Sequence, residues 1–157
     1  MARYDVIDET IINAKPDSVY KALLDEFSGL THWWMPHWEA KQREGFERGK
    51  VGSAIDITIH RRFTPKFSAR ATELLEHQLI RADLFEGDFL GKAEWSLEEI
   101  NGNTKLSMMW SVKTNRLLLN ILGIFINFGK KHSDVVQKGF IGLSDYLQRN
   151  IRSMGAN

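Results

Sequence analysis

Hydrophobic and polar residues alternate through the middle of the chain, between residues 54 and 113. This period of two is typical of strands that pack one face on a core. Short turn-like links separate the alternating stretches, which favours consecutive antiparallel strands over crossover helices. The predicted strands cover residues 4–12, 39–44, 54–60, 66–75, 79–85, 89–99 and 104–113. On their inward face we expect Ile55, Ile57, Ile59, Phe89, Gly91, Ala93, Trp95, Leu97, Leu106, Met108, Trp110 and Val112.

Two other stretches have the spacing of amphipathic helices. Pro16 and Asp17 predict a helix start, because Pro suits a first turn and an acid suits the positive end of the helix dipole. From Asn115 to Arg152, apolar residues recur every three or four positions, which predicts one long helix with a polar spine opposite. Its apolar stripe contains Leu118, Leu122, Phe125, Gly129, His132, Val136, Phe140, Leu143 and Leu147.

A recognisable motif spans the start of the first predicted helix. Ile12, Ala14, Pro16, Val19 and Tyr20 resemble the I-x-A-x-P-x-x-V-W/Y opening of the START-like (SRPBCC) superfamily. Within that superfamily, the sequence is similar to the polyketide cyclase/dehydrase and lipid-transport group. Weaker matches to that group follow at Asp25, Leu30, Trp34, Pro36, Gly45, Gly49 and from Gly87 to Trp95.

The resemblance covers nearly the whole chain and implies a single START-like domain over residues 1–157. It implies an α+β helix-grip fold, in which a curved antiparallel sheet of about seven strands wraps around a long C-terminal helix. Two short helices would follow the first strand. An apolar cavity would lie between sheet and helix, and its lining would determine the function. The matching motifs are structural, and none identifies catalytic residues.

Composition narrows the function classes. With 43% hydrophobic and 26% charged residues, the chain has the composition of an ordinary soluble globular domain. The 21 Lys and Arg nearly balance the 20 Asp and Glu, so no overall field attracts nucleic acid. The absence of Cys excludes disulfides and thiol nucleophiles. Because the chain starts without a signal-peptide pattern and has no apolar run that could span a bilayer, we expect a cytoplasmic location.

The inward-facing residues predict a large apolar site where the sheet meets the long helix. Small residues interrupt it at Gly91, Ala93, Gly129 and Gly139, which indicates either close backbone packing or space for a ligand. The predicted ligand-binding residues are Trp34, Trp38, Trp95, Met108, Trp110, Phe125, Gly129, His132, Val136 and Phe140.

Few polar groups accompany this apolar site. His132 is the titratable residue of the apolar stripe, and it could orient a ligand, act as an acid or base, or be a structural histidine. Asp8 or Glu9 could be its partner, since these acids lie on opposite faces of the first strand. Arg61 and Arg62 belong to a basic hairpin tip, which is more often solvated than an anion site. The five His have no metal-ligand spacing, and there is no phosphate loop or G-x-S-x-G elbow, so we expect no metal and no cofactor.

Trp33, Trp34 and Trp38 are crowded into one short segment. We expect one of these indoles in the core and the others at a pocket mouth, a partner surface or a membrane interface. The segments from Trp33 to Trp38 and from Leu117 to Phe128 are therefore candidates for transient membrane contact. A homodimer is a further alternative.

The leading functional hypothesis is binding or transport of a small hydrophobic ligand, such as a lipid, isoprenoid, quinone or polyketide, in the internal cavity. The alternative is a polyketide cyclase, aromatase or dehydratase-like enzyme, which needs a polar pair in the cavity to move protons. A third hypothesis is a protein-interaction module, which a filled core without a cavity would favour.

Overall fold

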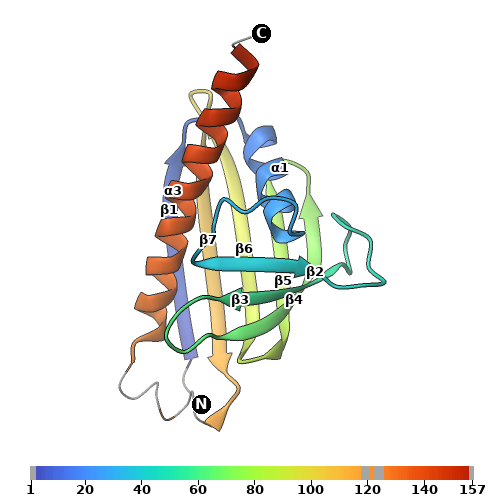
Figure 1. Cartoon of the computed structure of the whole chain (residues 1–157), viewed down its shortest axis with the longest axis vertical. Helices are drawn as coiled ribbons and strands as arrows, with labels where there is room; N and C mark the ends of the chain where they lie inside the picture. Colours follow the sequence, from blue (N-terminus) through green and yellow to red (C-terminus); the bar gives the residue numbers. More distant parts are fainter. Residues whose placement is uncertain (1–2, 118–120, 122–125, 156–157) are drawn as a thin grey trace.

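The computed structural model describes residues 3–117, 121 and 126–155 (Figure 1). One antiparallel sheet contains the strands in the order β1-β7-β6-β5-β4-β3-β2. Their bounds are β1 (Arg3–Ile12), β2 (Trp38–Gln42), β3 (Ala54–Ile59), β4 (Lys66–Leu75), β5 (Leu79–Gly87), β6 (Phe89–Ile100) and β7 (Asn103–Thr114). Helix α1 (Pro16–Phe27) follows β1, and helix α3 (Phe128–Gly155) ends the described chain. Figure 1 shows β2 and β3 crossing in front of β6 and β7, so the sheet is strongly curled, and α3 lies along β1.

This architecture confirms the α+β helix-grip fold predicted from the sequence. All predicted strands are present, and their ends differ from the prediction by at most two residues. The prediction of two short helices after the first strand is wrong, because α1 is followed by turns over residues 28–37. Gly29 adopts a left-handed φ of 76° directly after α1. The amides of Trp33 and Trp34 then donate to the Glu26 side chain instead of continuing a helix.

The long C-terminal helix begins later than the sequence predicted. Asn127 precedes α3 and caps it, since its Oδ1 accepts a hydrogen bond from the Lys130 N–H at 3.0 Å. Asn115 and Arg116 lie outside a helix and contact Asp88 instead, through the Asn115 N–H at 2.9 Å and Arg116 Nε at 2.6 Å. Residues 118–120 and 122–125 of the predicted helix lie outside the described residues. The apolar spacing of the sequence continues through the Asn127 cap. For that reason the spacing does not show where α3 begins.

Glycines and register shifts bend the sheet. Gly87 and Gly91 have φ angles of 103° and 153°, which L side chains rarely adopt. A Cβ on Gly87 would lie closer than 3.0 Å to the backbone of β4, and one on Gly91 would lie equally close to the backbone of β7. The β4–β5 register also shifts after Ser68 and after Ala71. Such irregularities increase local bend and twist, and the sheet acquires a concave face.

Helix α3 packs on this concave side of the sheet against β1. Asp8 on β1 is 8% exposed and accepts hydrogen bonds from Ser133 Oγ at 3.0 Å and Gln137 Nε2 at 3.4 Å. The buried apolar residues of α3 are Phe128, Val135, Val136, Phe140, Leu143 and Leu147. Among the described helices, none combines the length and apolar character needed to cross a membrane.

Candidate functional site: an apolar cavity

A cavity of about 570 Å³ lies between the concave face of the sheet and α3. Its walls come mainly from apolar side chains of β3 to β7 and from the N-terminal half of α3. Lining residues include Ile55, Ile57, Ile59, Phe67, Ala69, Leu84, Phe89, Trp95, Met108, Trp110, Val135 and Val136. Many of these positions are the inward-facing ones that strand alternation predicted. The sheet therefore supplies most of the surface that a bound molecule would touch.

Most of the sequence-predicted site residues line this cavity. They are Trp34, Trp38, Trp95, Met108, Trp110, His132 and Val136. Phe140 is outside the lining and packs edge-on behind Trp95, with ring centroids 6.3 Å apart. Gly129 faces β1, because a Cβ there would lie 3.2 Å from Val6. Phe125 lies outside the described residues.

The segment from Trp33 to Trp38, called the tryptophan segment below, forms a buried wall of the cavity. Trp33, Trp34 and Trp38 are 8%, 3% and 6% exposed, so all three indoles are buried, where we had expected one. The Glu26 side chain, only 2% exposed, accepts hydrogen bonds from the Trp33 N–H at 3.1 Å and the Trp34 N–H at 3.0 Å. Trp34 Nε1 donates to the Val135 carbonyl at 2.8 Å. Hydrogen bonds thus attach this segment to both α1 and α3.

Glycines of α3 allow this wall to approach the helix. A Cβ on Gly139 would lie closer than 3.0 Å to the Trp34 indole, and one on Gly142 would lie closer than 3.0 Å to the Trp33 carbonyl. These glycines therefore serve close packing, which is one of the two roles left open by the sequence. Ala93 instead leaves space for a ligand, because it lines the cavity together with its cross-strand partner Ala82.

His132 contributes a neutral imidazole to the cavity. Its ring stacks on Trp110 with centroids 4.0 Å apart and an interplanar angle of 7°. Burial lowers the pKa of His132 to about 3, because removing the ring from water disfavours its charged form. Its Nδ1 is buried and has no hydrogen-bond partner among the described residues. His132 can therefore donate or accept a hydrogen bond at neutral pH, but it is a poor proton acceptor.

Neither acid of β1 is a partner for His132. Asp8 is occupied by α3 side chains, and Glu9 is exposed and accepts a hydrogen bond from Ser107 Oγ at 3.2 Å. Within the described residues the cavity lining contains no Asp or Glu, and no group of three His, Asp or Glu side chains could hold a metal ion. The described lining thus lacks a carboxylate–imidazole pair.

Arg61 is a cavity-lining residue that the sequence interpretation missed. It lies in the β3–β4 link and lines the cavity, and its Nε and Nη2 are buried without a hydrogen-bond partner in the described structure. The expectation of a solvated tip holds for Arg62, which is exposed. A usable signal was present, because Ile55, Ile57 and Ile59 point inward and the same alternation places residue 61 on that face.

Solved structures of other proteins have the same fold as this chain. No protein-family model matches the chain, and no curated protein has a significantly similar sequence. Among solved structures, the Zhui aromatase/cyclase from Streptomyces sp. R1128 is 12% identical, with a TM-score of 0.69 over 98% of this chain and 99% of that chain. Ara h 8.0201 is 14% identical, with a TM-score of 0.68 over 94% and 99%. TTHA0849 from Thermus thermophilus is 17% identical, with a TM-score of 0.68 over 94% and 99%. These structures confirm the prediction at the level of the fold: the chain shares its helix-grip architecture with them.

Proposed function

We propose that the protein binds a small hydrophobic molecule, of the lipid, isoprenoid, quinone or polyketide kind, inside this cavity and carries it without chemical change. The observation that supports the proposal most is the volume of about 570 Å³ combined with an almost wholly apolar wall. Burial of about 300 Å² of apolar ligand surface would contribute about 7 kcal/mol before the cost of immobilising the ligand. Apolar burial would therefore supply the main driving force for binding, which needs no specific polar contact.

The size of the cavity also argues against a simple packing defect. At about 24 cal/mol per Å³, an empty apolar cavity of about 570 Å³ would cost about 14 kcal/mol. This cost is comparable with the whole stability of a typical domain. A collapsible core would close such a space, whereas a core that is braced from outside can keep it for an occupant.

A cyclase-like enzyme is the runner-up, since one neighbour in fold is an aromatase/cyclase. Such chemistry needs a group that takes up and returns a proton near neutral pH. His132 has a pKa of about 3 and no carboxylate partner among the described residues, so binding is the better supported function. A filled core would have favoured the protein-interaction hypothesis, and the cavity weighs against it. Membrane contact, a homodimer and a cytoplasmic location stay predictions of the sequence.

Native mass spectrometry of freshly purified protein tests the proposal, together with organic extraction and titration by the neutral dye Nile red. We expect a hydrophobic adduct in native spectra that disappears on denaturation, or saturable one-to-one binding of the dye by the apo protein. A ligand at about 100 times its dissociation constant should add about 2.7 kcal/mol of stability. A clean apo mass combined with no saturable dye binding would overturn the proposal. Recovery of a chemically altered ligand after incubation would instead support the enzyme.

A further inference from the structure

The charged residues that line the cavity all have the same sign. Among the described residues they are Lys50, Arg61, Arg62 and Lys131. The whole chain, by contrast, has 21 basic and 20 acidic residues. The cavity is therefore locally basic in a nearly neutral protein, and its field favours an anionic group on the ligand.

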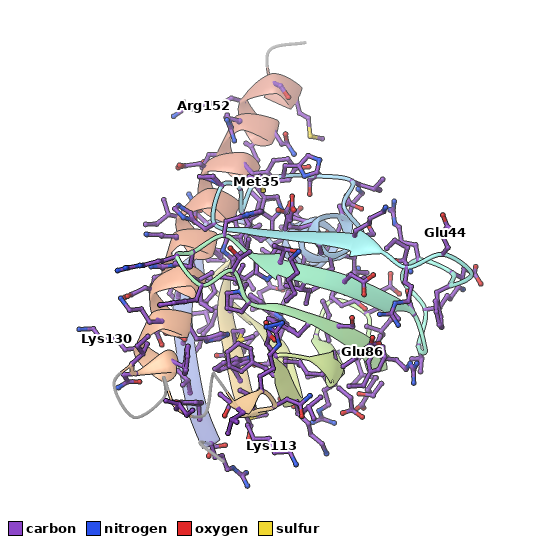
Figure 2. The ribbon with its side chains drawn as sticks, turned by 60° about the horizontal axis from the view of Figure 1, so that its bottom comes forward. Met35, Glu44, Glu86, Lys113, Lys130 and Arg152 are labelled. Carbon is purple, nitrogen blue, oxygen red and sulfur yellow. The ribbon has the colours of Figure 1, made fainter. Side chains whose placement is uncertain are left out.

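Three of these cations lie on the side of the cavity next to α3. Arg61 and Arg62 belong to the β3–β4 link, which curves toward α3 in Figure 1, and Lys131 lies in the first turn of that helix. Lys50 belongs to the β2–β3 loop. Figure 2 shows this loop, marked by Glu44, projecting away from α3 on the opposite side of the molecule from Lys130. The α3 side is thus the more basic end of the cavity.

Arg61 differs from the other three cations in its burial. Lys50, Arg62 and Lys131 are exposed, whereas the Nε and Nη2 atoms of Arg61 are buried. These two atoms carry N–H groups along one edge of the guanidinium, and neither has a hydrogen-bond partner among the described residues. Arg61 as a whole is partly buried, and buried N–H groups without partners are costly, so this edge suits a complementary anion.

The surroundings of Arg61 provide no such anion. The charges of Lys138 and Arg61 add to burial in lowering the pKa of His37, which indicates a positive local field. Glu39 is an acid on the neighbouring strand, and it contacts His60 at 3.2 Å. None of the residues outside the described ranges is Asp or Glu. The described chain thus leaves this edge of Arg61 free for the anionic group of a bound molecule.

We propose that the hydrophobic ligand carries one carboxylate, which Arg61 binds through Nε and Nη2 while the hydrocarbon part fills the cavity. The inference rests on the proposed function and specifies its ligand class. Two parallel donors on one edge of a guanidinium match the two oxygens of a carboxylate. The exposed cations Arg62 and Lys131 attract the anion at longer range, and salt screens their contribution.

The test compares dodecanoate with 1-dodecanol, which has the same chain length and no charge. Affinities are measured by displacement of Nile red from wild type, Arg61→Gln, Arg61→Lys and the control Arg62→Gln. We expect wild type to prefer dodecanoate, and Arg61→Gln to weaken dodecanoate by about 10- to 100-fold with dodecanol unchanged within about twofold. Arg61→Lys should restore only part of the loss, because an ammonium lacks the two-donor edge. The control should lose little affinity, and only at low salt.

The outcomes separate this inference from the proposed function. Equal affinity of wild type for the two molecules, or an equal loss of both in Arg61→Gln, would refute the carboxylate while leaving the hydrophobic site intact. Failure of both molecules and of the dye to bind wild type would refute the proposed function. Thermal unfolding provides a fold control: Arg61→Gln should melt at or above the wild-type temperature, since it removes an unpaired, partly buried charge.

Discussion

Substituting leucine for Ala93 should make the protein more stable and less able to bind. Ala93 on β6 lies opposite Ala82 on β5, and both line the cavity. Both alanines are partly exposed although they occupy the middle strands of the sheet, because their side chains end in open space. A leucine at position 93 would place three more carbon atoms in that space.

The expected magnitude follows from the area removed from water. At about 0.8 kcal/mol per buried methylene, Ala93→Leu should raise the free energy of unfolding by about 2 kcal/mol. For a chain of this size, that corresponds to a rise of about 4–8 °C in melting temperature. The same atoms occupy ligand volume, so the affinity for Nile red should fall. Urea unfolding and dye titration measure the two effects on one preparation.

Ala54→Leu is the matched control. Ala54 is 0% exposed on β3 and does not line the cavity, so a larger side chain there has no room. Overpacking of this kind costs about 1–3 kcal/mol, and the two substitutions should therefore change stability in opposite directions. If Ala93→Leu destabilises the protein as much as Ala54→Leu, or if it leaves dye binding unchanged, the cavity is closed in solution and the reasoning fails.

Other substitutions test the supports of the cavity. The unfolded state takes up a proton at His132 near pH 6.5 and the folded state only near pH 3, so stability should fall with decreasing pH in that window by up to about 1.4 kcal/mol per unit. His132→Phe should flatten this acid limb in urea titrations at pH 5 and 7, and an unchanged slope would contradict the lowered pKa. Gly139→Ala should destabilise the protein by about 1–3 kcal/mol, because its Cβ would collide with Trp34. Gly155→Ala is the control, since Gly155 lies in open space and its substitution should not destabilise the protein. Equal melting temperatures of the two variants would refute the close approach of Trp34 to α3. Glu26→Gln replaces an acceptor with a donor and should cost about 1–3 kcal/mol in urea unfolding, and a neutral result would mean that the tryptophan segment holds without it.

The sequence predicted the sheet well because alternation reports directly which side of a strand is buried. Strand ends and inward faces followed from that signal, and so did cavity walls such as Trp95 and Trp110. The start of α3 was missed because the cap depends on one side chain, Asn127, while the apolar spacing continues through it. Local patterns report burial within an element and are less informative about where the chain turns.

The polar and small residues of the site were harder to assign, because their roles depend on partners far away in the chain. Gly139 is small because of Trp34, which lies more than a hundred residues earlier. Asp8 is buried because α3 supplies Ser133 and Gln137. The periodic pattern of apolar residues carries no information about these long-range contacts. Arg61 is an intermediate case, since alternation alone could have placed it inward.

The polar groups that brace the cavity lie outside its lining. Because they are separate from the lining, the fold can tolerate a large apolar cavity. Glu26 fixes the tryptophan segment from behind, Asp8 joins β1 to α3, and the buried Thr104 Oγ1 donates to the Ala14 carbonyl at 2.7 Å. None of these polar residues lines the cavity. Substitutions in the lining should therefore change which molecule is accepted before they unfold the protein. For this reason, Ala93 and Arg61 can be tested by ligand binding in folded variants, whereas Glu26 is tested by stability.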